Sequence, residues 1–131
     1  MRVLLDTHTF LWWIDNDSRL SAQVGEIIRD GANEVLFSAA SSWEIAIKAQ
    51  LGKLALPTNS ATLEDFIIDQ LAKNAFHILP IQLEHTLQVY GLPLHHRDPF
   101  DRVLVAQSQV ENVSILTDDP RIRRYNAQVI W

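Results

Sequence analysis

The stretch Arg2-Val3-Leu4-Leu5-Asp6 (RVLLD) is a short apolar run that ends in a carboxylate. Two later segments have the same apolar character, Glu34–Phe37 (EVLF) and Val113–Thr117 (VSILT). Continuous apolar runs of this length are typical of strands that are buried on both faces of a parallel sheet. Phe76–Leu79 and Ala127–Ile130 are predicted to be further strands. The sequence therefore predicts a central, mainly parallel sheet.

Helical segments are predicted between these strands, and three of them end at a glycine, the residue most often found just past a helix. They cover Ser21–Asp30, Ser41–Leu51, Thr62–Lys73, Gln82–Tyr90 and Pro99–Glu111, and a first helix is expected to begin near Thr7. Alternating strands and helices predict an α/β fold with helices on both faces of the sheet, a three-layer α/β/α sandwich. Leu54–Ser60 is predicted to be a loop, and residues 1–131 are expected to form a single domain.

The composition excludes several classes of site. The formal net charge is −5, from 11 Lys and Arg against 16 Asp and Glu, so we do not expect a broad basic face that captures nucleic acid. The absence of cysteine excludes thiolate metal sites and cysteine nucleophiles and fits a reducing cytoplasm, the expected location. No apolar run approaches the roughly 18 residues that span a bilayer, so no membrane partner is expected.

Acidic residues occur at four places that this topology would bring to one edge of the sheet: Asp6, Glu44, the pair Asp98 and Asp101, and the pair Asp118 and Asp119. The carboxyl ends of parallel strands line a common crevice, where ligands bind. Several carboxylates in one crevice repel one another unless a cation lies among them. Oxygen ligands without cysteine favour Mg²⁺ or Mn²⁺ over zinc.

Most of these acids also have a purely structural explanation. Ser41-Ser42-Trp43-Glu44 matches a capping box, and Asp98-Pro99-Phe100-Asp101 matches an N-cap followed by proline at the first helical position. Asp119-Pro120 resembles the cap of a short turn, and Asp6 could cap the first helix. The alternative function is therefore a non-catalytic α/β interaction module whose acids only cap helices.

The same segments resemble the PIN-domain ribonucleases, and among them the VapC-like toxins of bacterial type II toxin–antitoxin operons. The segments are, in order, Leu4–His8, Ser41–Lys48, Asp98–Arg102 with Ala106-Gln107, and Leu116–Asp119, and the likeness runs to the Tyr125–Trp131 tail. The resemblance implies a compact α/β/α sandwich and an acidic endoribonuclease site that depends on Mg²⁺ or Mn²⁺. It also implies a homodimer, an RNA substrate and neutralisation by a cognate antitoxin.

Position by position, the resemblance implies that Asp6, Glu44 and Asp101 are the family's first three acids. Asp101 fits better than Asp98 because the family's acid precedes the stretch that matches Leu104–Gln107. Asp119 best matches the fourth acid, with Asp118 as the alternative. We therefore expect Asp6, Asp101 and Asp119 to bind the metal for hydrolysis of RNA, with Glu44 coordinating directly or through water.

Several basic residues and histidines near these acids are candidates for binding RNA or metal. Arg121, Arg123 and Arg124 directly follow Asp119 and are the best candidates for contacts with RNA phosphates, although a solvated surface is the alternative for each. Arg97, Arg102, Lys48 and Lys53 are the other basic groups that could flank the crevice. His8, His95 and His96 are expected to form hydrogen bonds or lie on the surface more often than to bind metal, and Trp43 is expected in the core.

Overall fold

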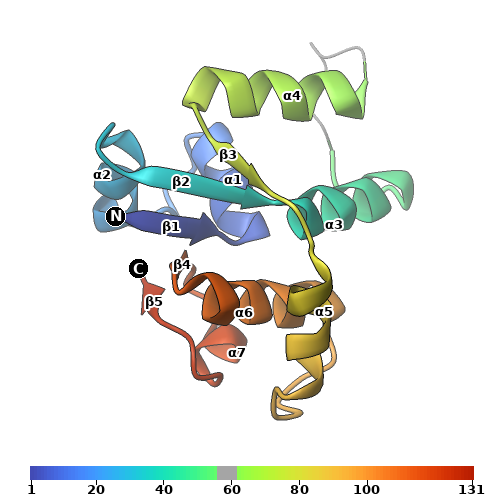
Figure 1. Cartoon of the computed structure of the whole chain (residues 1–131). Helices are drawn as coiled ribbons and strands as arrows, with labels where there is room; N and C mark the ends of the chain where they lie inside the picture. The colour runs from blue at the N-terminus through green and yellow to red at the C-terminus, as the bar shows by residue number, and fades with distance from the viewer. Residues whose placement is uncertain (56–61) are drawn as a thin grey trace.

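A computed structural model describes residues 1–55 and 62–131 and has at its centre a five-stranded sheet in the order β3-β2-β1-β4-β5 (Figure 1). The strands are β1 (Arg2–Leu5), β2 (Glu34–Ser38), β3 (His77–Leu79), β4 (Ser114–Leu116) and β5 (Val129–Ile130). Every strand pairing is parallel, and Leu4 of β1 lies between Leu36 of β2 and Ile115 of β4. The predicted parallel sheet is thus confirmed.

The longer helices agree with the prediction to within a few residues, and the short last helix lies where a capped turn was predicted. They are α1 (Thr7–Ile14), α2 (Ala22–Arg29), α3 (Ala39–Gln50), α4 (Leu63–Asn74), α5 (Leu83–Tyr90), α6 (Pro99–Glu111) and α7 (Pro120–Arg123). Helix α3 begins earlier than predicted because the hydroxyl of Ser38 accepts the Ala40 N–H and caps it. The predicted loop Leu54–Ser60 falls mainly on residues that lie outside the described ranges. No helix in the described part of the chain is long and apolar enough to cross a bilayer.

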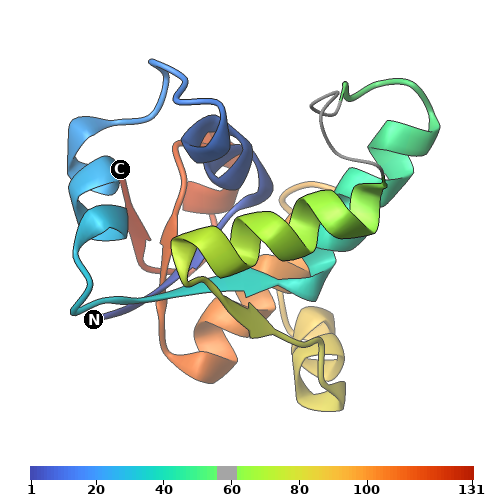
Figure 2. The same cartoon turned by 90° about the horizontal axis from the view of Figure 1, so that it is seen from above.

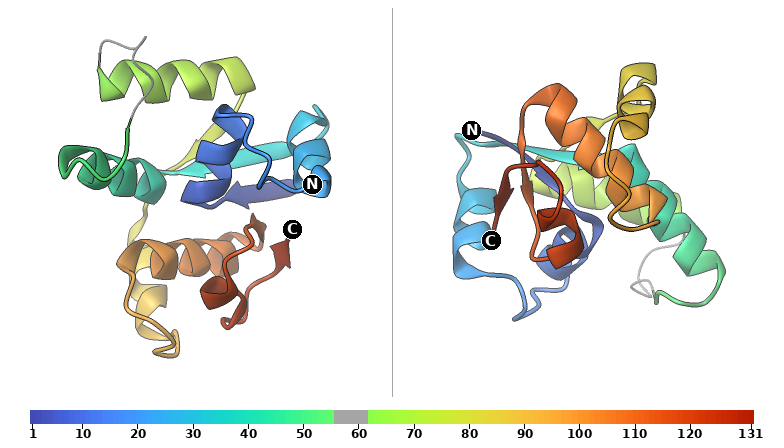
Figure 3. Two further views of the ribbon diagram at one scale, coloured as in Figure 1. Left: turned by 180° about the vertical axis from the view of Figure 1, so that it is seen from behind. Right: turned by 90° about the horizontal axis from the view of Figure 1, so that it is seen from below.

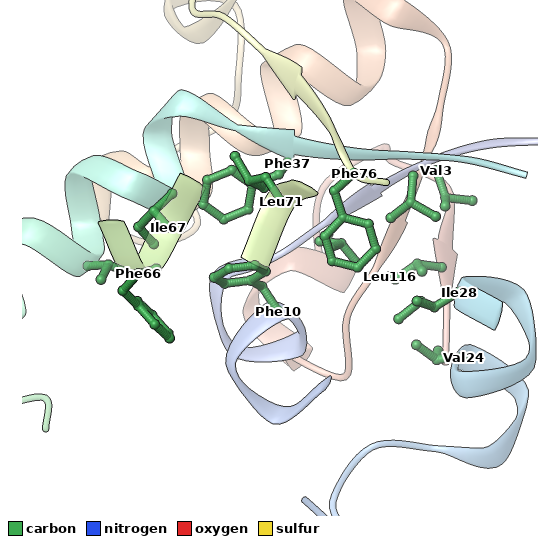
Figure 4. Close-up of a cluster of buried hydrophobic side chains, with 13 residues drawn as sticks. Val3, Phe10, Val24, Ile28, Phe37, Phe66, Ile67, Leu71, Phe76 and Leu116 are labelled. Carbon is green, nitrogen blue, oxygen red and sulfur yellow. The ribbon is translucent and has the colours of Figure 1, made fainter. Parts of the chain in front are cut away.

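Two apolar cores, one on each face of the sheet, make the three layers. Val3 and Leu5 face a core that is completed by α1, α2 and α4 and is drawn in Figure 4. Leu4 faces the opposite core, to which α5, α6 and α7 contribute. Figure 3 shows these two groups of helices on opposite sides of the sheet, and Figure 2 gives the view from above α4. The predicted three-layer sandwich is confirmed, and each fully buried large side chain in it contributes about 1.5–3 kcal/mol.

The chain reverses its direction of travel across the sheet at β1. From β1 it proceeds to β2 and β3 on one side, and it then crosses to β4 and β5 on the other. The loops that follow β1 and β4 therefore diverge, which in open parallel sheets opens a crevice at the carboxyl ends of the strands. The Thr9 hydroxyl donates to the Leu116 carbonyl (2.7 Å), so the first turn of α1 is attached directly to the end of β4.

Candidate active site

Asp6 lies directly after β1 and caps helix α1. Its Oδ1 accepts the Thr9 N–H at 2.7 Å, and its Oδ2 accepts a hydrogen bond from the Thr117 hydroxyl at the end of β4. The residue is only 3% exposed, and this burial raises the pKa of Asp6, which the hydrogen bonds from Thr117 and Thr9 partly oppose. The carboxylate is thus held rigidly between the ends of two adjacent strands.

Glu44 lies in the second turn of α3 and is also buried, at 4% exposure. Its Oε1 accepts from the Thr7 hydroxyl at 2.6 Å, and its Oε2 pairs with Lys48 Nζ at 2.6 Å. Since Thr7 follows Asp6 in the chain, this hydrogen bond joins Glu44 to the end of β1. The predicted capping box is wrong, because the helix already begins at Ala39 and Glu44 turns toward α1 instead of toward its own backbone.

Trp43 was expected in the core, and this prediction is wrong. The residue is 54% exposed, and its ring packs edge-to-face on Phe100 with the ring centroids 4.9 Å apart. The inward face of α3 is taken by Ser41, Glu44 and Ile45, all of them buried. Because these positions are three and four residues apart, helical periodicity turns Trp43 outward.

Asp98 and Asp101 lie at the start of α6 and have different roles. Asp98 is the N-cap: its Oδ1 accepts the N–H groups of Phe100 (2.9 Å) and Asp101 (3.1 Å), as predicted. The Oδ2 of Asp101 lies 3.2 Å from His96 Nε2 and 3.9 Å from Arg121 Nη2. Burial, followed by the charges of Asp98, Asp119 and Glu44, raises the pKa of Asp101 to about 7. The charges of Asp98, Asp119 and Glu44 therefore all act on Asp101.

Asp119 caps α7 and is joined to both sides of the crevice. Its Oδ2 lies 2.9 Å from Arg121 Nη2, the same atom that approaches Asp101. Its backbone N–H donates to the Thr117 hydroxyl (3.0 Å), which in turn donates to Asp6. Burial favours a higher pKa for Asp119, but the hydrogen bonds from Arg121 outweigh it and hold the pKa below its usual value. Asp118 is exposed and makes no hydrogen bond among the described residues, whereas Asp119 is linked to Asp101 through Arg121 and to Asp6 through Thr117.

Two of the candidate arginines, Arg121 and Arg102, have partners within the protein. Arg121 pairs with Asp119 and Asp101 as described above, although its side chain is exposed, as are those of Arg123 and Arg124. Arg102 is only 8% exposed, and its guanidinium donates to the Pro93 carbonyl (2.8 Å) and the Tyr125 hydroxyl (3.0 Å). The expectation that Arg102 could flank the crevice is therefore wrong.

Two hydroxyl groups of the site, those of Thr7 and Thr117, were not among the predicted site residues. Both are buried, and they link Glu44 and Asp119 to the segment around Asp6. Their positions in the sequence could have indicated this role, since Thr7 directly follows Asp6 and Thr117 lies between a buried strand and two acids.

The oxygen donors of the crevice fit a hard divalent cation. A cation would relieve the repulsion that raises the pKa of Asp101, and carboxylate ligands suit Mg²⁺ or Mn²⁺. In the described ranges, three ligand atoms of different residues lie within 4.8 Å of one another only at Glu84, His85 and Glu111, not in the crevice. Mg²⁺ usually keeps several of its waters and is bound directly by only one or two carboxylates, so acids that lie farther apart would act through those waters.

The Glu84–His85–Glu111 group is a structural contact between α5 and α6. The Gln82 N–H donates to His85 Nδ1 at 3.0 Å, so the neutral ring carries its proton on Nε2. That proton points to Glu111 Oε1, 2.9 Å away. A metal at Nε2 would have to displace this proton while Nδ1 keeps its backbone donor, which makes this buried histidine a poor ligand.

Comparisons with known proteins point to one family. Residues 3–128 match the family described as PIN domain. The chain is 27% identical over 128 residues to Ribonuclease VapC22 of Mycobacterium tuberculosis, covering 94% of this chain and 91% of that protein. It is 40% identical over 60 residues to Ribonuclease VapC16 of the same organism, a match that covers 46% of this chain and 40% of that protein.

Two solved structures share the fold. One is VapBC2 from Rickettsia felis bound to a DNA fragment from their promoter, with a TM-score of 0.72, 12% identity and coverage of 99% of this chain and 98% of that one. The other is VapBC-1 from nontypeable Haemophilus influenzae, with a TM-score of 0.62, 17% identity and coverage of 99% and 97%.

Proposed function

The chain belongs to the PIN-domain family, and from this premise we propose that it is a metal-dependent endoribonuclease, the toxin of a type II toxin–antitoxin pair. The observation that carries the proposal is the gathering of acids at the switch point of the sheet, where Asp6, Glu44, Asp101 and Asp119 are joined by Thr7, Thr117 and Arg121. The names of the relatives Ribonuclease VapC22 and Ribonuclease VapC16 support the same activity.

The four acids have different roles in the proposed metal binding, which follow from their surroundings. Asp6 is fixed by two hydrogen bonds and buried, so it supplies the rigid ligand. Asp101 and Asp119 come from two different helix starts and complete the set, and Glu44, paired with Lys48, acts directly or through water. When bound, Mg²⁺ or Mn²⁺ lowers the pKa of an attacking water and offsets charge on the phosphate.

The proposed RNA contacts are Arg121, Arg123 and Arg124 on and just after α7. Arg123 and Arg124 are exposed beside the acids, so they can approach the phosphates of a bound strand without leaving an internal partner. Arg121 is held by Asp119 and Asp101, and a metal bound to those acids would release its guanidinium toward the substrate.

The partners follow from the same proposal. An antitoxin that inhibits the enzyme has to cover the acidic crevice, and a basic side chain is the group best suited to pair with its carboxylates. The proposed assembly is a homodimer, and the proposed compartment is the cytoplasm, where the RNA substrate occurs.

The alternative, an interaction module whose acids only cap helices, accounts for part of the structure. Asp6, Asp98 and Asp119 do cap helices. Glu44 and Asp101 cap no helix. Asp101 lies close enough to three other acids that, together with burial, their charges raise its pKa to about 7. Capping alone gives no reason to gather like charges, which favours the nuclease.

The test is an assay of the purified protein with structured RNAs, in Mn²⁺ and in chelator. The proposal predicts cleavage only with the metal and a higher melting temperature in Mn²⁺. Asp101→Asn should lose both effects, whereas Asp69→Asn, the same change on the exposed face of α4, should keep them. Wild-type protein that shows neither effect would favour the interaction module.

A further inference from the structure

A chain of hydrogen bonds runs from the buried Arg102 to the carboxylate of Asp101. Arg102 Nη1 donates to the Tyr125 hydroxyl at 3.0 Å, and this hydroxyl lies 3.1 Å from His96 Nδ1. The other ring nitrogen, His96 Nε2, lies 3.2 Å from Asp101 Oδ2. Arg102 and Tyr125 are 8% and 3% exposed, so this end of the chain of contacts is shielded from water.

The hydrogen count at Tyr125 fixes the direction of these bonds. The hydroxyl oxygen accepts from Arg102 Nη1 and also from the backbone N–H of His96 (3.4 Å). Its single hydrogen is then available for His96 Nδ1, which must be the accepting nitrogen. The neutral ring consequently carries its proton on Nε2 and donates it to Asp101 Oδ2.

Arg102 is anchored independently of the site. It donates to the carbonyl of Pro93 at 2.8 Å and to that of Val89 at 3.3 Å, both in or just after α5. The orientation of the Tyr125 hydroxyl is therefore set by the packing of α5 on α6. The His96 proton is fixed by the fold and does not depend on what the crevice contains.

The two oxygens of Asp101 are consequently unlike. Oδ2 accepts the hydrogen bond from His96 Nε2 and lies near Arg121, whereas no hydrogen bond from the described residues reaches Oδ1. No buried side-chain polar atom in residues 1–55 and 62–131 lacks a partner, so Oδ1 is open to solvent. One oxygen of Asp101 is therefore free of hydrogen bonds from the described residues.

We propose that His96 is a positioning residue for Asp101, which it holds through Nε2–H···Oδ2 so that Oδ1 is aimed at the divalent cation, and that Tyr125 and Arg102 fix its tautomer. The inference rests on the proposed metal-dependent nuclease. Residues that orient a ligand in this way typically contribute 10–100-fold in metal affinity. His96 itself contacts neither metal nor RNA in this arrangement.

The test measures Mn²⁺ binding by calorimetry in the full chain. His96→Leu should weaken Mn²⁺ binding by about 10–100-fold, and His96→Gln, whose amide N–H can replace Nε2–H, should recover most of this loss. Tyr125→Phe keeps the aromatic ring but removes the hydroxyl that fixes the tautomer of His96. An intermediate loss of Mn²⁺ affinity is therefore expected. The matched control is His95→Leu, because His95 packs edge-on against the same tyrosine (4.9 Å between ring centroids) but is exposed and makes no hydrogen bond to an acid in the described ranges.

Nitrogen-15 NMR of the histidine rings gives a second readout that needs no metal, and its main result comes from wild-type protein alone. Metal-free wild-type protein should show His96 with its proton on Nε2, and Tyr125→Phe should shift this signal toward a mixture of tautomers. A proton on Nδ1, or wild-type Mn²⁺ affinity in His96→Leu, would overturn the inference while leaving the nuclease intact. Wild-type protein that neither binds Mn²⁺ nor cleaves RNA would overturn the proposed function, and this inference with it.

Discussion

Asp101 ionises at a pH at which most carboxylates are already charged, because it is buried beside Asp98, Asp119 and Glu44. Its folded-state pKa of about 7 lies well above the value of 3.8 for an unperturbed side chain. Between these two values the folded protein binds a proton that the unfolded chain has released. The stability that this proton represents is present at low pH and is lost as the pH rises.

The first prediction concerns the stability of the metal-free protein. Between pH 5 and pH 8 the free energy of unfolding should fall through Asp101 by at most about 3 kcal/mol, and Asp101→Asn should remove this part of the decline. Urea unfolding in chelator at pH 5 and pH 8 measures it for both proteins. If the stability of the wild-type protein and that of Asp101→Asn changed equally with pH, the pKa of Asp101 would not be raised by its surroundings.

Asp6→Asn should have opposite effects on the stability of the protein and on its activity. The substitution removes a charge that is 3% exposed while keeping an oxygen for the Thr9 N–H, so the melting temperature should be unchanged or higher. RNA cleavage in Mn²⁺ should fall by about 100-fold or more, since losing a ligand costs at least as much as losing its support. Cleavage at the wild-type rate would remove Asp6 from the metal site, and Asp69→Asn serves as the control.

The sequence was sufficient to predict where most of the acids lie, but not what they contact. Asp6 and Asp119 follow strands and Asp98 precedes Pro99, so their places at strand and helix ends are local properties of the chain. The partner of Glu44 depends on how α3 packs against α1. Several serines near Glu44 could have capped the helix, and only the tertiary fold selects Ser38.

At the level of elements, α7 carries the exposed basic groups of the proposed RNA contact. For single strands, each phosphate contact adds about 0.7 to the slope of log affinity against log salt. Neutralising Arg123 and Arg124 together by glutamine should therefore reduce the slope of RNA binding by about 1.4. The control is Arg29→Gln with Lys73→Gln, two exposed basic residues in the last turns of α2 and α4, which should leave the slope unchanged. Equal slopes in all three proteins would show that α7 does not contact RNA.

The end of α4 offers a test of the fold that is independent of function. Ala75 follows this helix in the left-handed conformation, with φ at 53°, where glycine is favoured over any residue with a Cβ. Ala75→Gly should stabilise the protein by about 1 kcal/mol. Ala72→Gly, inside the same helix, should destabilise it by a similar amount. A loss of stability in Ala75→Gly, measured by urea unfolding, would contradict this backbone assignment.

The whole molecule depends on the order of its strands, which local patterns could not provide. The apolar runs predicted the strands themselves, because burial on both faces requires them. That β1 lies between β2 and β4 is decided by the packing of helices on both faces. This order brings the end of β1 beside the end of β4, and residues more than a hundred positions apart, Asp6 and Thr117, come into contact.

The most direct test of the metal site is an anomalous difference map from crystals of the protein soaked in Mn²⁺. The account predicts a peak in the crevice, coordinated by Asp6 and Asp101 and absent in Asp101→Asn. No peak in the crevice, or a peak only beside His85 and Glu111, would contradict it.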